Sequence, residues 1–338
     1  MLAHSLWVHG VPLRFETDAM DVASDFAHDF GYFLVTDSSS MSCNGFMVRH
    51  HQSADCPWKP VAPGRGFRSR LAWRLGNRRR LCMLGSAQVD YDVAKGRCDI
   101  YCDDLKIAYE AVYLIVLSYL GEAMDMQAMH RIHGFGFVRE NIGGILLGPS
   151  GAGKSTLAME LLRKNAVSIL SDDTPFVRPD GAMMSFPQRI ALREKPSLSP
   201  DCYRSFKRAR YGEKFVVGVD VFGSAVANQG HIDWLILSGS LKSSEASIHE
   251  VSRWRLVWPL TKWVIIGYET PQIWELFIRP SIFDVVSKFR ILCSRVHTAI
   301  RIGLSAKVAR FNFASDVTRS AEVFETFLTA KTLRANLP

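Results

Sequence analysis

The most constraining feature of the sequence is the octapeptide Gly148–Ser155, GPSGAGKS. It matches the pattern G-x-x-x-x-G-K-[ST] in full, between an apolar segment, GGILL, and an amphipathic one, KSTLAMELLRK. A strand, a glycine-rich turn and a helix in this order form the phosphate-binding loop of P-loop proteins. The pattern therefore predicts an α/β domain with this apolar segment as a strand of its sheet.

The residues of this loop have separable expected tasks. Glycines let successive backbone N–H groups turn toward phosphates, and the start of the helix adds its positive dipole end. Lys154 would reach the β and γ phosphates, and the Ser155 hydroxyl would ligate magnesium. The predicted cofactors are ATP and Mg²⁺. The predicted nucleotide site consists of Gly148, Ser150, Gly151, Ala152, Gly153, Lys154, Ser155 and Thr156.

Two adjacent carboxylates, Asp172 and Asp173, follow the next apolar segment in SILSDD. Beside a bound triphosphate, one carboxylate can hold magnesium while the other accepts a hydroxyl proton as the phosphoryl group leaves. A plain ATPase needs only to place a water. The alternative is a turn or cap before TPF, because Asp is common at strand ends. The sequence LSGS at 237–240 suggests a transporter-type ATPase, but no apolar strand ending in Asp-Glu follows it, so that class is discarded.

Charge favours an acidic partner. The formal net charge is +8, which suits a nucleotide, a phosphorylated product, an acidic peptide or nucleic acid. Much of the excess lies in RGFRSRLAWRLGNRRR, where Phe67 and Trp73 are interleaved with Arg65, Arg68, Arg70, Arg74, Arg78, Arg79 and Arg80. No nucleic-acid-binding motif accompanies this stretch. We therefore favour a solvated basic hairpin or a face for an acidic polypeptide over nucleic-acid binding.

The length of 338 residues predicts about two domains. The first hundred residues carry short alternating segments between turn formers, which predict a small β-rich domain: HSLWVHG, YFLVTD, FMVRH, RLCMLG and CDIYCD. A linking helix is expected in LKIAYEAVYLIVLSYLGEAM, behind Asp103 and Asp104. The predicted domains are 1–125, a β-rich unit with a role in substrate recognition, and 126–330, a P-loop catalytic domain with one or two helices over 271–304.

The chain is expected to be cytoplasmic. No run of 18 or more apolar residues occurs, so no membrane span is predicted, and the N-terminus lacks the basic start and long apolar stretch of a signal peptide. The seven cysteines are scattered without a CxxC pair, which suits a reducing compartment. One cluster raises the question of zinc, although its spacing matches no standard ligand pattern: Cys43, His50, His51 and Cys56.

Taken together, these motifs resemble the catalytic core of the HPr kinase/phosphorylase family. The resemblance lies in HGFGFVRENIGGILLGPSGAGKSTLAMELLRK followed by LSDD, and it is closer to the divergent HPr-kinase-like proteins, some of which are encoded with lasso-peptide precursors and phosphorylate them. It spans roughly His130 to Arg193, with a weaker likeness in the preceding helix and in RYGEKF. In that family a histidine precedes the P-loop in HG, as His133 and Gly134 do here.

The resemblance implies a mixed sheet around the P-loop, akin to phosphoenolpyruvate carboxykinase, and ATP-dependent phosphorylation of a hydroxyl. It makes Asp172 the general base, Asp173 the magnesium-side carboxylate and His133 the residue that tunes the catalytic aspartate. The two aspartates can exchange roles, because this chain has one extra residue between the loop and the pair. Three further cations are placed where they can meet phosphates or simply be solvated: Arg189, Arg193 and Lys214.

The sequence also departs from the family. The glycine-containing E-x-R-G signature is missing after the Asp pair, which argues against HPr as the substrate and against a reverse phosphorylase reaction. We interpret the chain as a kinase of a serine in a protein or peptide, such as a ribosomally made precursor. A small-molecule hydroxyl kinase and a non-transferring ATPase or regulator are the alternatives, and a nucleic-acid-binding ATPase is a third. The acceptor and the oligomeric state, including a homo-oligomer, are left open.

Overall fold

The chain forms two compact units, each described here by itself. They comprise Met1–Met124 with Pro271–Val285, and Asp125–Thr270 with Val286–Pro338. The first unit therefore includes residues 271–285, which lie within the range 271–304 where helices of the second domain were expected. The structure, a computed structural model, describes residues 1–35, 45–62, 71–75, 77–208, 212–218, 221, 225–239, 245–270, 273 and 282–335.

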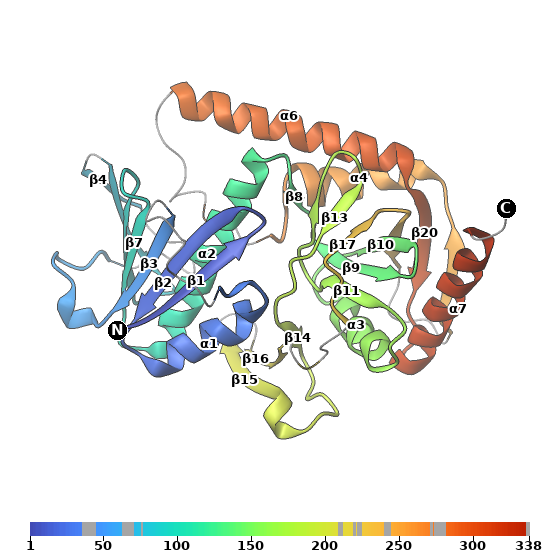
Figure 1. The fold of residues 1–338 in the computed structure, drawn as a ribbon, viewed down its shortest axis with the longest axis horizontal. Helices are drawn as coiled ribbons and strands as arrows, with labels where there is room; N and C mark the ends of the chain where they lie inside the picture. Colours follow the sequence, from blue (N-terminus) through green and yellow to red (C-terminus); the bar gives the residue numbers. More distant parts are fainter. Residues whose placement is uncertain are drawn as a thin grey trace. The chain divides into compact units, whose positions relative to one another are not determined.

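A seven-stranded sheet dominates the N-terminal unit, in the order β1-β2-β3-β7-β6-β5-β4 (Figure 1). Strand β3 is parallel to both of its neighbours, and the remaining pairs are antiparallel. Helix α1 (Met20–Phe30) lies between β2 and β3 in the chain, as the crossover that two parallel strands require. The strands are β1 (Leu2–Val8), β2 (Val11–Thr17), β3 (Phe46–His51), β4 (Leu71–Leu75), β5 (Arg78–Met83), β6 (Ala87–Asp92) and β7 (Arg97–Tyr101).

One of the strands expected in this unit is not formed. This strand was expected in YFLVTD, residues 32–37, of which residues 32–35 are described. Gly31–Phe33 forms a 3-10 helix instead, and Leu34 makes only an isolated bridge to Leu6. Phe33 is buried. Burial of a short apolar run gives the same sequence pattern in a helical turn as in a strand, so periodicity alone did not distinguish them.

Helix α2 (Leu105–Met126) is the core helix of this unit. Asp104 caps it, accepting hydrogen bonds from the N–H groups of Lys106 and Ile107 at 3.0 and 3.1 Å. By length and composition it is the one helix among the described residues that could cross a membrane, with a mean hydropathy of 1.3, but 67% of that window is buried within the protein. Such burial is typical of a core helix, and the buried Tyr109 hydroxyl donates to Asp29 of α1.

The C-terminal unit is built on a six-stranded mixed sheet, in the order β11-β9-β10-β18-β20-β19 (Figure 1). Strand β10 is parallel to β18, and β18 to β20, whereas the other pairs are antiparallel. The α/β class with a mixed sheet is thereby confirmed. The strands are β9 (Gly134–Arg139), β10 (Ile142–Leu147), β11 (Ser168–Ser171), β18 (Trp234–Ser238), β19 (Ser247–Glu250) and β20 (Lys307–Asn312).

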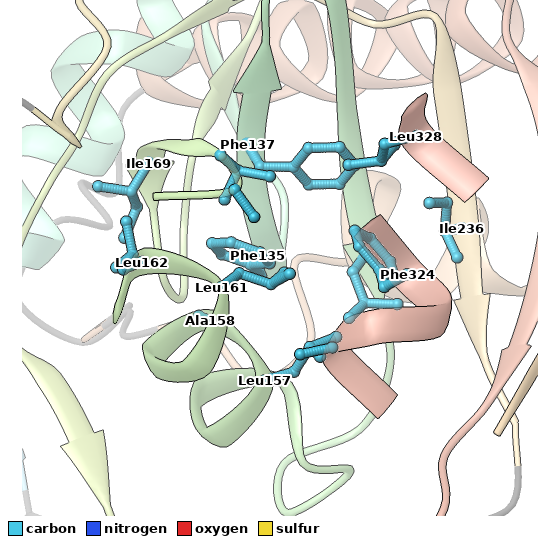
Figure 2. Close-up of a cluster of buried hydrophobic side chains, with 14 of the residues drawn as sticks. Phe135, Phe137, Leu157, Ala158, Leu161, Leu162, Ile169, Ile236, Phe324 and Leu328 are labelled. Atoms are coloured by element: carbon cyan, nitrogen blue, oxygen red, sulfur yellow. The ribbon is translucent and has the colours of Figure 1, made fainter. Parts of the chain in front are cut away.

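Helices cover both faces of this sheet. Figure 2 shows side chains of α3 (Lys154–Arg163) and α7 (Val317–Ala335) gathered around Phe135 and Phe137 of β9. On the opposite face, Ile145 and Leu147 of β10 pack in a second cluster with residues of α4 (Val257–Leu260), the π-helix η7 (Thr261–Ile265) and α6 (Ile282–Ser305). Strand β10 is apolar throughout because alternate side chains enter different cores.

Smaller elements complete this unit. A four-stranded sheet has the order β17-β13-β12-β8, and a three-stranded sheet has the order β14-β16-β15. These are β8 (His130–Arg131), β12 (Phe176–Val177), β13 (Ala182–Met184), β14 (Ile190–Leu192), β15 (Tyr203–Arg208), β16 (Gly212–Val217) and β17 (Gln229–His231). The described 3-10 helices of this unit are η4 (Pro200–Cys202) and η6 (Arg253–Leu256), and those of the N-terminal unit are η1 (Gly31–Phe33) and η3 (Ser53–Asp55).

A buried ionic network fixes α6 to the start of the C-terminal unit. Asp125 accepts hydrogen bonds from His130 Nδ1 at 2.7 Å and from Arg295 Nε and Nη2 at 3.1 and 2.5 Å. His130 Nε2 lies 2.8 Å from Ser294 Oγ. Burial acts to raise the pKa of Asp125, but the hydrogen bond from His130 and the charge of Arg295 outweigh it, and the pKa is lowered.

Candidate active site

The loop Gly148–Gly153 connects β10 to α3 and has the backbone of a tight glycine-rich turn. Gly151 and Gly153 have φ values of 84° and 83°, in the left-handed region that favours glycine. A Cβ atom on Gly148 would lie 2.0 Å from Ser238 Oγ at the end of β18, so that position also needs glycine. The loop leads directly into the N-terminus of α3, whose dipole favours anions. Of the other predicted loop residues, Ala152 is buried, whereas Ser150 and Thr156 are exposed.

Lys154 is buried at the base of this loop. Its Nζ donates to the carbonyl oxygens of Gly148 and Pro149 at 2.7 and 3.1 Å, and lies 3.1 Å from His133 Nε2. Burial lowers the pKa of Lys154, although nearby carboxylates act in the opposite direction. The ammonium group therefore joins the loop to the histidine that precedes β9.

His133 lies between Lys154 and Asp173. An ammonium group can only donate, so Nε2 accepts and the ring proton is placed on Nδ1, which lies 2.9 Å from Asp173 Oδ1. The following Gly134 donates its N–H to the Asp173 carbonyl at 2.9 Å. A Cβ on Gly134 would lie 2.7 Å from Ile145 Cγ2, which explains why glycine follows the histidine.

Asp172 follows β11 directly and is buried beside the loop. Its Oδ2 accepts a hydrogen bond from Ser155 Oγ at 2.7 Å, and its Oδ1 is buried without a hydrogen-bond partner among the described residues. Burial raises the pKa of Asp172 from 3.8 to about 7, only partly offset by the hydrogen bond from Ser155. A buried carboxyl that titrates near neutrality has the property required of a general base.

The pairing of these carboxylates differs from the one carried over from the resemblance. Ser155, the expected magnesium ligand, lies with Asp172, whereas Asp173 lies with His133. Hydroxyl and carboxylate oxygens are the hard ligands that Mg²⁺ prefers. The unpartnered, buried Oδ1 of Asp172 beside the Ser155 hydroxyl is an oxygen set that fits Mg²⁺.

Of the three cations considered from sequence, Arg193 lies against the loop. A Cβ on Gly151 would be 2.8 Å from its Nη2, so the guanidinium covers that glycine. Arg189 is buried immediately before β14. Lys214 is half-buried on β16, which pairs with β14. Arg189 and Arg193 thus flank β14, Lys214 lies on the neighbouring strand β16, and Arg193 reaches the glycine-rich loop.

Glu269 is part of the site, although the sequence did not suggest it. Its Oε2 accepts a hydrogen bond from the Ser150 N–H at 3.0 Å and lies 3.2 Å from His133 Nε2. Its only local signal is a Gly-Tyr-Glu-Thr turn, 119 residues beyond Ser150. Nothing in its immediate sequence links it to the loop.

The zinc hypothesis finds no support in the described part of the cluster. His50 has both ring nitrogens engaged, Nδ1 with Thr17 Oγ1 and Nε2 with the Cys102 carbonyl, each at 2.9 Å. His51 Nε2 lies 3.0 Å from Asp99 Oδ1, and Cys56 donates to the Trp58 carbonyl. Across the described residues no group of three or more His, Cys, Asp or Glu side chains could hold a metal. Cys43 lies outside the described residues.

The arginine-rich stretch is described only in part. Arg65, Arg68 and Arg70 lie outside the described residues, and for Arg74 only the backbone is described. Arg78 and Arg80 lie on β5 within 3.4 and 3.7 Å of Asp90 Oδ2, and the Arg80 guanidinium is 4.3 Å from the centre of the Trp58 ring. These two charges are therefore partly neutralised within the N-terminal unit.

Comparison with known proteins gives little further information. No family model matches the chain, and no curated protein matches its sequence. Among solved structures, the chain is similar to the Hpr(Ser) kinase/phosphatase from Coxiella burnetii, with 13% sequence identity over 62% of this chain and 99% of that one, and a TM-score of 0.30. A TM-score this low does not establish a shared fold.

Proposed function

We propose that this chain is an ATP- and Mg²⁺-dependent kinase that phosphorylates a hydroxyl group. The observation that carries the proposal is Asp172, a carboxyl buried beside the glycine-rich loop whose pKa is raised by burial to about 7. A protein that only hydrolyses or senses ATP needs a metal carboxylate, whereas a kinase needs a base for its acceptor. Asp172 has the burial and the pKa of such a base.

In the proposed reaction the acceptor oxygen bonds to the γ phosphorus of ATP as the bond from that phosphorus to the β–γ bridging oxygen breaks, and ADP leaves. The hydroxyl proton passes to Asp172 Oδ1, the oxygen that has no hydrogen-bond partner among the described residues. Lys154 and the loop N–H groups stabilise the phosphate charge. In this assignment Ser155 and Asp173 would hold Mg²⁺, which would neutralise phosphate charge.

His133 and Asp173 support this arrangement. With Nε2 accepting from Lys154 and Nδ1 facing Asp173, the imidazole holds the ammonium in place and carries no transferable proton toward Asp172. The exchanged assignment, with Asp172 on the metal and Asp173 as the base, is favoured by one contact, the Ser155–Asp172 hydrogen bond. The two assignments differ in their pH dependence.

The acceptor class rests on the sequence resemblance, which favours a serine in a protein or peptide. A small-molecule hydroxyl remains the alternative substrate. The test is incubation with ATP labelled at the γ position and candidate products of neighbouring genes, with mass spectrometry to detect a gain of phosphate. Transfer to a peptide serine supports the proposal, and hydrolysis without transfer to any acceptor supports the ATPase alternative.

Two variants with matched controls test the site. Lys154→Ala should abolish transfer, whereas Lys164→Ala, at the other end of α3 and paired with Glu322, should not. Asp172→Asn should abolish transfer while ATP binding is largely retained, and the exposed Asp180→Asn should have no effect. Full transfer by Asp172→Asn would refute its assignment as the base.

A pH profile separates the two aspartates. If Asp172 is the base, kcat/KM of Asp173→Asn should still fall about tenfold per pH unit below the pKa of Asp172. If Asp173 is the base, that variant should lose transfer at every pH.

A further inference from the structure

A turn after the π-helix η7 holds Glu269 in an unusual conformation. Glu269 has a φ of 67°, and Gly267, two residues earlier, has a φ of 69°. The turn is closed by Thr270 Oγ1, which donates to the Gly267 carbonyl at 2.6 Å, and by the Tyr268 N–H, which donates to the Lys262 carbonyl at 2.9 Å. A glutamate in the left-handed region is disfavoured, so the surrounding contacts define its position.

The side chain of Glu269 is directed at the phosphate-binding loop. Its Oε2 accepts the Ser150 N–H at 3.0 Å, and this side chain is only 20% exposed. The same oxygen is 3.2 Å from His133 Nε2, but that nitrogen accepts from Lys154, so the bond from Ser150 is the one that holds Glu269. A carboxylate thus occupies one of the loop N–H groups that the proposed function assigns to phosphate.

Lys154 is also engaged with the loop itself. Its ammonium donates to the carbonyls of Gly148 and Pro149, so it lies along the loop. A phosphate oxygen that accepts from the Ser150 N–H would take the position that Glu269 Oε2 now holds, 3.0 Å from that nitrogen. Two anions cannot share this donor without repulsion.

We propose that Glu269 is an internal competitor of phosphate, which occupies the loop and must withdraw before nucleotide can bind. This inference rests on the proposed function, because it takes the loop to be the site of ATP phosphates. The apparent affinity for nucleotide is then reduced by the fraction of molecules in which Glu269 is bound. Removal of the carboxylate should therefore tighten binding.

The test is calorimetric titration of the full chain with Mg²⁺–ATP and with inorganic pyrophosphate. Glu269→Gln removes the charge at nearly constant shape, and Glu269→Gly also favours the positive φ of the turn, so at least one should fold normally. Both should bind each ligand about tenfold or more tightly than the unaltered chain. Glu140 is a matched control, because it is exposed, lies in the β9–β10 turn and has a φ of 51°. Glu140→Gln and Glu140→Gly should remain within about twofold.

The outcomes separate this inference from the proposed function. If the unaltered chain binds ATP and the Glu269 variants bind equally or more weakly, Glu269 is not a competitor and the inference is overturned. If neither the chain nor the variants bind ATP or pyrophosphate, the assignment of the loop fails as well. Hydrogen exchange without nucleotide gives a second measurement: the peptide containing Ser150 should exchange faster in Glu269→Gly, and unchanged exchange would contradict the proposed contact.

Discussion

Asp172→Asn is expected to make the protein more stable at neutral and alkaline pH. In the folded protein burial raises the pKa of Asp172 to about 7, compared with an ordinary value of 3.8. Between these two values the native chain holds a proton that the unfolded chain has lost, so stability falls as the pH rises. Above pH 7 the native carboxylate is ionised in a buried position, and the full free-energy penalty of burying this charge destabilises the folded protein. Asparagine has no such cost and can still accept from Ser155.

The size of the effect follows from the two pKa values. They differ by about 3, and each unit corresponds to 1.36 kcal/mol, so the variant should gain roughly 4 kcal/mol at pH 8 and almost nothing at pH 4. In a unit of this size, 1 kcal/mol changes the melting temperature by about 2–4 °C. The melting temperature should therefore rise by about 8–16 °C at pH 8.

The measurement is scanning calorimetry of both proteins from pH 4 to pH 8 without nucleotide. Asp173→Asn is the matched control, because Asp173 is the neighbouring residue and its side chain is 51% exposed, so its removal should give no comparable gain. A gain for Asp172→Asn that is equal at pH 4 and pH 8 would refute the reasoning, and so would a loss of stability at pH 8. If Asp172 is the proposed base, the variant should combine higher stability with loss of transfer.

Two further variants test the packing of the C-terminal unit. Gly143→Ala should lose about 2 kcal/mol or more of stability, because its Cβ would lie 2.1 Å from the His231 carbonyl oxygen. Gly31→Ala is the control and should change stability little, because nothing lies within 4 Å of its Cβ position. Equal melting temperatures of the two variants would contradict the contact at Gly143. Arg295→Met should lose about 3–5 kcal/mol, because Asp125 is left buried without the guanidinium, and adding Asp125→Asn should restore part of it. Chemical denaturation measures both, and a loss below about 1 kcal/mol for Arg295→Met would show that the ion pair is dispensable.

The parts of the site that are local in sequence could be predicted. Strand β10, the glycine loop and α3 are continuous, and each has a pattern of its own. The antiparallel β9–β10 and β9–β11 pairings bring His133 and Asp173 to the loop within a short stretch of chain. Glycine at position 134 gives the backbone the close approach that this arrangement needs. Local hydrogen bonding and strand pairing were therefore sufficient to predict that His133 and Asp173 lie near the loop.

Contacts that depend on tertiary structure could not be predicted in the same way. Glu269 reaches Ser150 from a turn whose sequence is ordinary, and its position depends on how η7 packs against the sheet. The choice of Asp172 as the partner of Ser155 depends on side-chain direction at the end of β11, which a dipeptide Asp-Asp does not specify. The 3-10 turn at Gly31–Phe33 shows the same limit, since a short apolar run with one buried residue, Phe33, fits either a strand or a helical turn.

The position of β20 has a consequence for synthesis of the chain. Strand β18 lies beside β10, the strand that leads into the glycine-rich loop, and pairs on its other edge with β20. Roughly 70 residues separate Ser238 from Lys307, so at about 5–20 residues per second a ribosome takes about 4–14 s to supply the missing neighbour. During that time Trp234, Leu235 and Ile236 lie on an apolar strand with an open edge. The nascent chain is therefore most prone to aggregation, and most in need of a chaperone, after β18 has emerged and before translation reaches the C-terminal strand.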